Sequence, residues 1–366
     1  MIVSEASKLS ERKRRAIGRL IVGFEGLEPS AEMLEVLSGY TPAGAILFAR
    51  NIESQEQTVA CNRQLSTLWK NGETPWISLD QEGGRVRRIK ERQWPTMRSI
   101  GELNDVAITK KVIRALNTEV RHWGFTGNWA PCADVDSNPA NPVIGDRSFS
   151  RDPEQCAQHV IATIEAMHEV GVQPCIKHFP GHGDTDIDSH LDLPWVRKSI
   201  PELERCEWHP FKRAIQAGAE VVMTAHVMFP ALDEEFPATM SHAILSGLLR
   251  ETLGYTGVIV SDDMEMKAVR GRYPVAHQMD KAVLAGVDAF LVCSKSELQA
   301  ECVESLIRLQ EHSEQHEHLA EASIQRLYKQ MRTRQKHASI PLSDYQPDQW
   351  ASLCLELEGQ YKSRLG

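Results

Sequence analysis

The chain has 366 residues, of which 42% are hydrophobic and 25% are charged, a composition typical of a globular protein that buries a substantial core. Its formal net charge of −9 argues against a broad electrostatic attraction to nucleic acid or to an anionic membrane surface. We therefore expect a small or neutral partner rather than a nucleic acid or a membrane.

The N-terminal segment is basic but lacks the apolar core and the cleavage site of a secretory signal, and no later run approaches a membrane-spanning length. The 8 cysteines are scattered singly, with no CxxC pair. This spacing favours reduced thiols over a zinc ribbon or a disulfide framework. We expect a cytoplasmic protein.

Short apolar runs rich in β-formers alternate along the chain with amphipathic segments long enough for helices. The runs are LIVGF from Leu20, GAILF from Gly44, WISL from Trp76, FTGNW from Phe125, VQPCI from Val172, EVVMT from Glu220, GVIV from Gly257 and AFLVC from Ala289. Helices are predicted from Asp152 and from Ser241, the second with a serine cap and a stop at Gly254. This alternation predicts parallel βαβ units and a (β/α)8 barrel of the TIM type. A doubly wound sheet is the alternative, but no glycine-rich dinucleotide fingerprint follows the first run.

The residues after Cys293 are charged and helical in pattern, and we predict one or two surface helices there. His312, His316 and His318 could indicate a metal site, but among so many Glu and Gln residues we favour a solvated helix face. The last residues predict a helix packed back on the barrel. We therefore expect a barrel domain of residues 1–335 and a helical tail of residues 336–366.

Polar residues follow nearly every predicted strand. They are Glu25, Arg50, Asp80, Glu82, Asp134, Lys177, His178, His226, Asp262 and Asp263. In a barrel these positions converge on the C-terminal rim, where active sites of this fold lie. One such residue would mean little, but their recurrence predicts a functional site.

The loop KHFPGHGDTDIDSH, residues 177–190, concentrates titratable groups. His178 and His182 have an H-x3-H spacing, and with Asp188 and His190 they could suggest a metal site. That spacing needs a continuous helix, however, which the intervening proline and glycine break. Asp188 and His190 instead suggest a dyad, in which the carboxylate accepts a hydrogen bond from one ring nitrogen and orients the other. We favour the dyad and predict no metal.

Asp262 directly follows the apolar run GVIV, at a predicted strand end. A carboxylate there can attack an anomeric carbon, and retaining glycosidases place the second catalytic group about 5 Å away. A helix N-cap is the structural alternative for Asp262. Asp263 could supply that cap and leave Asp262 for chemistry.

Five motifs, in this order, closely resemble those of the family 3 glycoside hydrolases, and in particular the single-domain bacterial β-N-acetylglucosaminidases. The motifs are DQEGGRV from Asp80, GDRSF from Gly145, the loop of residues 177–190, MTAHV from Met223 and GVIVSDDM from Gly257. The resemblance covers roughly residues 15 to 300, and the loop motif is very specific. Departures are small, such as Met264 where related sequences often have Leu.

The resemblance implies a role for each matching residue. Asp262 would be the nucleophile, and His190 paired with Asp188 would be the acid/base. Five further residues would bind the non-reducing sugar: Asp80, Arg88, Arg147, Lys177 and His178.

The implied activity is that of a retaining exo-β-N-acetylglucosaminidase that needs no cofactor. Its substrate would be a cell-wall fragment with terminal GlcNAc on anhydro-N-acetylmuramic acid, in peptidoglycan recycling. A related β-glycosidase or glycoside phosphorylase acting on another sugar is the alternative enzyme. A noncatalytic sugar-binding barrel is the alternative from another class, against which the presence of Asp262, Asp188 and His190 argues.

Overall fold

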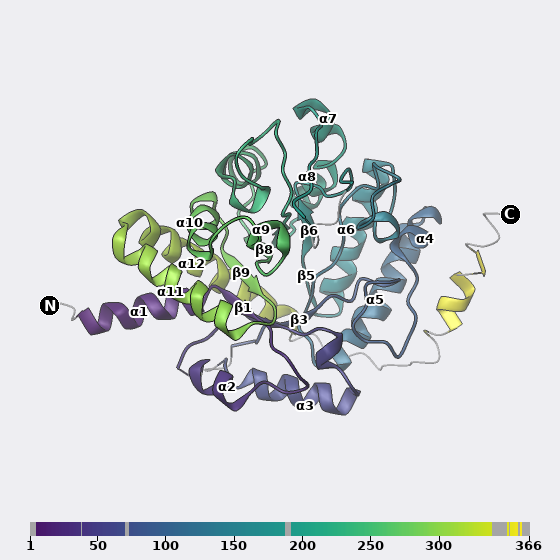
Figure 1. Cartoon of the computed structure of the whole chain (residues 1–366). Coiled ribbons are helices and arrows are strands. Elements are labelled where there is room, and N and C mark those ends of the chain that lie inside the picture. Colours follow the sequence, from purple (N-terminus) through teal and green to yellow (C-terminus); the bar gives the residue numbers. More distant parts are fainter. Residues whose placement is uncertain are drawn as a thin grey trace.

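The computed structural model describes residues 5–37, 39–69, 73–186 and 192–338, together with residues 350, 352–357 and 359–360. Strands and helices alternate along this part of the chain (Figure 1). The strands are β1 (Leu20–Val22), β2 (Gly44–Ile46), β3 (Ile77–Leu79), β4 (Gly127–Asn128), β5 (Gln173–Pro174), β6 (Ile176–Phe179), β7 (Val221–Thr224), β8 (Val258–Asp263) and β9 (Ala289–Val292). The α-helices are α1 (Glu5–Ile17), α2 (Ala31–Leu37), α3 (Gln55–Ser66), α4 (Met97–Glu102), α5 (Val106–His122), α6 (Pro153–Glu169), α7 (Ile200–Arg205), α8 (His209–Gln216), α9 (Lys267–Arg270), α10 (Val275–Ala285), α11 (Ser296–His312) and α12 (Glu314–Ala338). The same residues include the short 3₁₀ helices η1 (Ala49–Asn51), η2 (Gly145–Arg147) and η3 (Ala238–Met240) and the π-helix η4 (Ala243–Thr252).

The strands form one parallel sheet in the order β5-β4-β3-β2-β1-β9-β8-β7-β6. The strands at the two ends of this order, β5 and β6, are neighbours in the chain and are separated only by Cys175. β5 pairs with β4, and β6 pairs with β7, so one extended segment joins both edges of the sheet. The sheet therefore closes into a barrel, and the (β/α)8 fold expected from the sequence is confirmed. The predicted fifth strand is split into two short pieces, and its second piece, β6, continues through Phe179 into residues that were predicted to begin the 177–190 loop.

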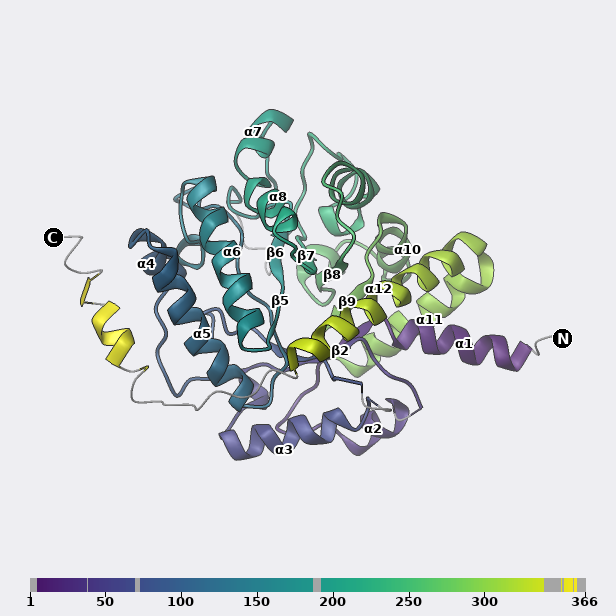
Figure 2. The same ribbon diagram turned by 180° about the vertical axis from the view of Figure 1, so that it is seen from behind.

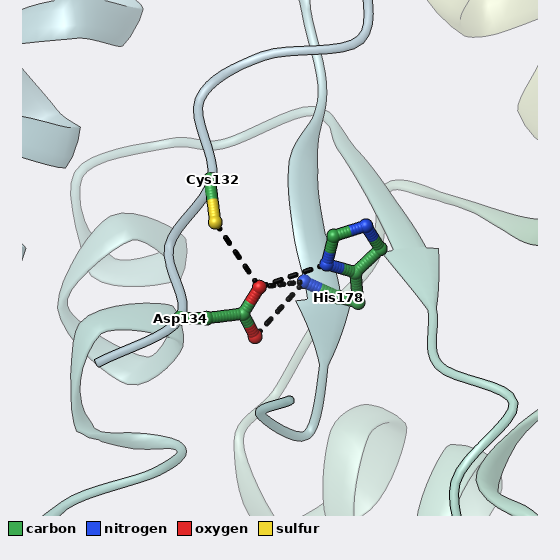
Figure 3. Close-up of side chains that lie close together, drawn as sticks. All are labelled: Cys132, Asp134 and His178. Atoms are coloured by element: carbon green, nitrogen blue, oxygen red, sulfur yellow. Dashed lines mark hydrogen bonds and ion pairs between the residues drawn. The ribbon is translucent and has the colours of Figure 1, made fainter. Parts of the chain in front are cut away.

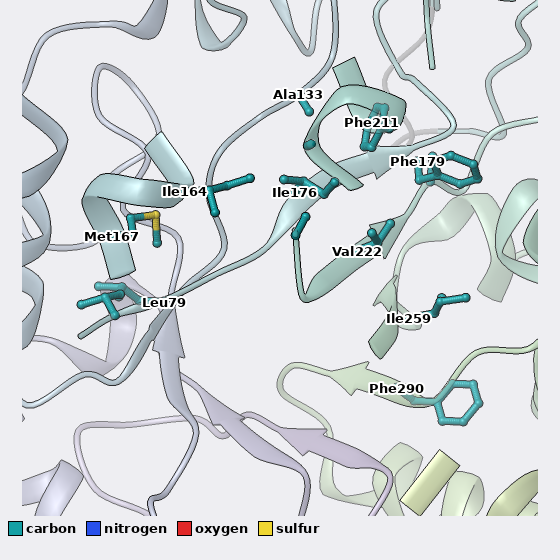
Figure 4. Close-up of a cluster of buried hydrophobic side chains, with 14 of the residues drawn as sticks. Leu79, Ala133, Ile164, Met167, Ile176, Phe179, Phe211, Val222, Ile259 and Phe290 are labelled. Atoms are coloured by element: carbon teal, nitrogen blue, oxygen red, sulfur yellow. The ribbon is translucent and has the colours of Figure 1, made fainter. Parts of the chain in front are cut away.

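Side chains of the strands point alternately into the barrel and outward, because successive residues of a β-strand face opposite sides. Ile21, Val258 and Val260 belong to the inner cluster, whereas Leu20 and Val22 belong to the outer cluster that packs against the helices. Part of the outer cluster, labelled in Figure 4, comprises Leu79, Ala133, Ile164, Met167, Ile176, Phe179, Phe211, Val222, Ile259 and Phe290. Burial of each large apolar side chain stabilises the fold by about 1.5–3 kcal/mol. The two layers thus hold the strand ends in fixed positions.

Two predicted helices form with the termini expected of them. Asp152 accepts a hydrogen bond from the Gln155 amide and caps α6. The Ser241 hydroxyl accepts one from the Ile244 amide at the start of η4, which is a π-helix rather than an α-helix. Gly254 follows η4 with a φ of 68°, a left-handed conformation that glycine adopts without strain.

Helix α12 covers the N-terminal end of the barrel, opposite the rim where the strands end (Figure 2). Leu327 packs in the inner cluster. Arg326 donates to Asp288 at 2.8 Å just before β9, and Arg334 donates to the Thr74 carbonyl at 2.9 Å just before β3. One or two surface helices were predicted after β9, and α11 and α12 form there. Helix α12 is not a surface helix over its whole length, however, since Arg334 is only 2% exposed.

The prediction of a solvated histidine face holds for His312 and His318, which are exposed, and is wrong for His316. His316 is buried, and its Nε2 lies 2.9 Å from the Asp280 carboxylate of α10. Sequence pattern alone could not show that α12 packs against α10 at this point.

The predicted division at residues 335/336 stays a prediction. Helix α12 continues through that position to Ala338. Residues 352–357 are helical, and Leu353, Cys354 and Leu357 are buried in the outer cluster. No helix in the described part of the chain combines the length and the hydropathy that a membrane span requires.

Candidate active site

A pocket of about 320 Å³ opens at the C-terminal ends of the strands. Its walls include Phe48, Asp80, Glu82, Arg85, Arg88, Arg147, Lys177, His178, His182, Asp262 and Asp263. A larger cavity, of about 650 Å³, lies at the opposite end of the barrel between α1 and α12. We place the chemistry in the smaller pocket, because the strand ends direct the titratable groups there and because barrels of this type react at that face.

A tight loop after β3 brings Arg88 back onto Asp80. Gly83 and Gly84 have φ values of 107° and 54°, which non-glycine residues rarely adopt. The Gln81 side chain is buried and accepts hydrogen bonds from the backbone amide of Arg88 and the one that follows, at 2.7 and 3.1 Å. The glycines of the DQEGG motif thus let the loop reverse direction, and Gln81 then holds it closed.

Five charged residues form an alternating row along the pocket wall, and we call this row the charge chain: Arg88, Asp80, Lys177, Glu82 and Arg147. The Lys177 ammonium lies 2.7 Å from Asp80 Oδ1 and 2.6 Å from Glu82 Oε1. Arg88 donates to the other oxygen of Asp80 at 2.9 Å. Arg147, on η2, donates from Nε and Nη2 to the two oxygens of Glu82, each at 2.8 Å. Such charge-assisted and bidentate contacts fix the side chains in one geometry.

The carboxylates of Asp80 and Glu82 and the ammonium of Lys177 are ionised at neutral pH. Burial alone would raise the pKa of Asp80, but Lys177 and Arg88 lower it below its usual value. Burial would also raise the pKa of Glu82, and Arg147 and Lys177 lower it well below its usual range. The ammonium of Lys177 is only 3% exposed, yet its pKa is raised because the effect of the two carboxylates exceeds that of burial.

Behind the pocket wall, the buried Asp134 carboxylate organises the start of the 177–190 loop (Figure 3). Its Oδ2 lies 2.8 Å from His178 Nδ1, and its Oδ1 accepts from the His182 amide at 2.6 Å. The backbone amide of His178 also donates to this carboxylate, at 3.2 Å. Burial would raise the pKa of Asp134, but His178 and the hydrogen bonds lower it. An ionised Asp134 requires a proton on His178 Nδ1, and in that tautomer Nε2 can accept a hydrogen bond from the pocket.

Cys132, Asp134 and His178 are the candidate metal ligands among the described residues, with donor atoms all within 4.8 Å of one another. The Asp134 oxygens are already occupied, because they accept from two backbone amides, from the His178 ring and from the Cys132 thiol at 3.2 Å. Burial raises the pKa of the Cys132 thiol well above its usual value, so the thiol keeps its proton and donates. A carboxylate offers about four lone-pair sites. We therefore interpret this cluster as a hydrogen-bond network.

The H-x3-H pair also has other partners. His182 Nδ1 lies 2.9 Å from the Thr185 hydroxyl, and burial together with the nearby His178 lowers the pKa of His182 to about 4. The two imidazoles meet edge to face, with centroids 5.7 Å apart. As predicted, no helix joins these histidines.

Asp262 lies at the end of β8 and borders the pocket. Its Oδ1 accepts from the Asp263 amide at 2.8 Å. Asp263 in turn accepts from the Glu265 amide at 3.0 Å, so it caps the turn that precedes α9, whose own N-cap is Met266. Burial raises the pKa of Asp263 to about 7. The helix N-cap that the sequence suggested for Asp263 is therefore wrong, because Asp263 caps only the preceding turn. Asp262 borders the pocket beside it.

Comparison with known proteins identifies the family to which the chain belongs. Residues 13–329 match the family described as "Glycosyl hydrolase family 3 N terminal domain". The chain belongs to glycoside hydrolase family 3. A family 3 β-N-acetylglucosaminidase from Paenibacillus sp. has a similar structure, with a TM-score of 0.87 and 32% identity over 95% of this chain and 68% of that one.

Two curated relatives differ in length. Beta-hexosaminidase A of Pseudoalteromonas piscicida is 37% identical over 71% of this chain but only 47% of its own length, so the chain spans about half of that protein. Beta-hexosaminidase of Nitrosomonas eutropha is 32% identical over 79% of this chain and 84% of its own. The match thus covers most of one relative and about half of the other.

The structure describes most of the predicted site residues of this family 3 chain and brings them to one pocket. Those residues are Asp80, Arg88, Arg147, Lys177, His178 and Asp262. Asp188 and His190 lie outside the described residues. The catalytic and binding roles of all eight stay predictions.

Three residues that were predicted to converge on the rim contact other parts of the barrel instead of lining the pocket. Arg50 and Glu25 pair with each other at 3.3 Å and do not line the pocket. His226 is buried, and its Nε2 lies 3.1 Å from the Asp263 carbonyl, where it supports the turn after β8. Glu82 and Asp134 were predicted at the rim, but no role was predicted for either. Only the folded structure shows which residues they contact.

Proposed function

We propose that this family 3 glycoside hydrolase is a retaining exo-β-N-acetylglucosaminidase that removes terminal GlcNAc through a glycosyl-aspartate intermediate. The observation that carries the proposal is the position of Asp262, which lies at a barrel strand end in the same pocket as the charge chain. The names of the relatives, beta-hexosaminidase and β-N-acetylglucosaminidase, support the choice of sugar.

The size of the pocket supports an exo-acting enzyme. Ligand sites usually measure roughly 300–1,000 Å³, and this one, at about 320 Å³, is near the lower limit. One sugar ring fits such a space better than a long segment of polysaccharide does.

In the proposed mechanism, Asp262 attacks the anomeric carbon and forms the covalent intermediate. His190, oriented by Asp188, protonates the departing glycosidic oxygen, and the same histidine then takes a proton from the water that releases the sugar. Of the wall residues, His178 offers Nε2 as an acceptor for one sugar hydroxyl. The carboxylates and cations of the charge chain accept from and donate to other hydroxyls.

The finer assignments belong to the same proposal. They are a peptidoglycan-derived fragment as substrate and a cytoplasmic location. Action on small glycosides that carry a terminal GlcNAc follows from the proposed activity.

A panel of aryl β-glycosides, assayed with and without phosphate, tests the activity. We expect the GlcNAc glycoside to be hydrolysed fastest and phosphate to leave the rate unchanged. Preference for another sugar would refute the sugar assignment, and a phosphate-dependent rate with a sugar phosphate as product would indicate a phosphorylase. Binding without turnover of any member would indicate a noncatalytic barrel.

A further inference from the structure

The loop that carries Asp188 and His190 is anchored before that dyad, at residues 181–186. The Asn141 side chain donates to the carbonyls of His182 and Gly183 at 2.8 and 3.0 Å. A Cβ built on Gly183 would lie 1.6 Å from the carbonyl oxygen of the residue after Asp134, so the backbone rests directly on the segment that follows β4. This side of the loop is therefore tied to the barrel wall.

The loop is anchored again after the dyad, at residues 193–198. Val196 donates its amide to the Met228 carbonyl at 2.9 Å, and the Met228 amide donates to the Pro194 carbonyl at 2.9 Å. Leu193 and Val196 are buried, at 3% and 0% exposure. The two anchored stretches thus lie on different segments of the barrel, one after β4 and one after β7.

Lys198 connects these two stretches. Its ammonium lies 3.3 Å from Asp184, before the dyad, and 2.6 Å from Glu207, which follows α7. Glu207 is fully buried, and the same oxygen also accepts from the Ser137 hydroxyl at 2.7 Å. A Cβ on Gly181 would come within 2.7 Å of the Glu207 side chain, so the loop packs closely over this carboxylate.

This ion pair is separate from the substrate pocket. None of the described residues that line the pocket belongs to the group of Ser137, Asp184, Lys198 and Glu207. Burial lowers the pKa of Lys198, but Glu207 and Asp184 raise it by more, so the ammonium is charged when it holds the loop. Glu207 is buried and Lys198 is partly exposed. Such a pair is weak evidence for added stability, because desolvation of the buried charge offsets much of the attraction. A role in fixing geometry explains it better.

We propose that Lys198 and Glu207 are positioning residues, whose ion pair fixes both ends of the loop so that its acid/base histidine reaches the glycosidic oxygen. The inference rests on the proposed function, because it takes His190 as that acid/base group. A general acid must lie within hydrogen-bonding distance of the oxygen that it protonates. Asp262 is carried by β8, so loss of the ion pair should impair protonation and leave nucleophilic attack intact.

Substrates with different leaving groups distinguish protonation from nucleophilic attack. A sugar or alkyl aglycone must be protonated as it departs, whereas dinitrophenolate leaves without help. In Lys198→Met we expect kcat/KM for a disaccharide to fall about ten- to a hundred-fold, and that for the dinitrophenyl glycoside to fall less than about three-fold. His190→Ala removes the histidine itself. Its loss of kcat/KM on the same two substrates is therefore the largest loss that mispositioning of this histidine can cause.

The variants are chosen to separate positioning from folding. Lys198→Met leaves Glu207 buried without its cation, which could destabilise the fold. The double variant Lys198→Met/Glu207→Gln therefore removes both charges together with the ion pair. It should keep the selective loss while melting close to the wild-type protein. Lys198→Arg should recover part of the disaccharide rate. Lys212→Met is the matched control, because Lys212 forms an exposed pair with Glu204 nearby, and it should match the wild type on both substrates.

Equal losses on both substrates in the double variant, or no loss in Lys198→Met, would overturn the positioning role. Preference of the wild type for another sugar would refute only the sugar assignment, because the same pair of leaving groups can then be compared on that sugar. A wild-type protein that hydrolyses no glycoside would overturn both proposals.

Discussion

Replacing Asp134 by Asn tests how the second layer of the site sets the proton on His178. The two side chains have the same shape, but one carboxylate oxygen becomes an NH₂ group. If the amide oxygen takes the place of Oδ1, it still accepts from the His182 amide, 2.6 Å away, and from the His178 amide at 3.3 Å. The NH₂ group then faces His178 Nδ1, at the position that now lies 2.8 Å away. Two donors cannot share that contact, so the ring proton must move to Nε2.

The fold should survive this change, because both backbone amides keep an acceptor. In the variant, however, His178 Nε2 is a hydrogen-bond donor to the pocket and no longer an acceptor. A sugar hydroxyl that donated to Nε2 therefore loses its partner. An unpaired polar group in a buried contact costs about 1–3 kcal/mol. We therefore expect kcat/KM for an aryl GlcNAc glycoside to fall roughly 5- to 150-fold, since 1.4 kcal/mol corresponds to about ten-fold.

A double-mutant cycle with His178→Ala checks the reasoning. If Asp134 acts through the imidazole, Asp134→Asn should change kcat/KM less than about two-fold once that ring is absent. Cys132→Ala is the control, because it removes only the weak thiol contact to the same carboxylate, and it should stay within about two-fold of the wild type. The reasoning is refuted if the full loss persists without the imidazole. Nitrogen NMR of the His178 ring should show the Nδ1–H form in the wild type and the Nε2–H form in the variant.

Three further predictions concern the nucleophile, metals and acid stability. Asp262→Gly should nearly abolish turnover, and azide should partly restore it with an α-glycosyl azide as product, whereas a β-azide would exclude Asp262 as the nucleophile. Treatment with EDTA should leave activity unchanged, and loss that zinc restores would revive a metal site. The folded-state pKa values of Asp80 and Glu82 are lowered, so their stabilisation is complete above their unfolded values of about 4 and is lost progressively as pH falls from there toward the lower folded-state values. The unfolding temperature should therefore drop between about pH 5 and pH 3, and an equal drop in Glu82→Gln would contradict this account.

The sequence predicted the architecture because buried parallel strands have a local signature. Eight of the nine described strands overlap one apolar run each, whereas β6 shares only Ile176 with such a run, and the polar residue after a run marks the rim. For the same reason Asp80, Lys177 and Asp262 could be expected to share one pocket before the fold was known. The resemblance in motifs then added roles that geometry alone does not assign.

The pairings that organise the site could not be predicted, because they join residues far apart in the chain. Asp134 meets His178 across 44 positions, and Arg147 meets Glu82 across 65. Such contacts depend on the register between neighbouring strands, which no local pattern encodes. The same limit explains why Arg50 was expected in the pocket, although its guanidinium instead donates to the Cys293 carbonyl at 2.6 Å.

The charge balance of the pocket favours hydrolysis over phosphorolysis. The charge chain contains three cations and two carboxylates, each held by its neighbours at 2.6 to 2.9 Å. The proposed nucleophile Asp262, as a carboxylate, would balance the remaining positive charge, and the other wall cation, Arg85, pairs with Asp146 at 2.9 Å. A neutral sugar can bind such a site without leaving any charge unpaired. A phosphate anion would lose its hydration on binding, and each cation among the described wall residues already has an anionic partner. Inorganic phosphate should therefore neither accelerate turnover nor appear in the sugar product, and a phosphorylated product would show that the charge chain rearranges to release a cation.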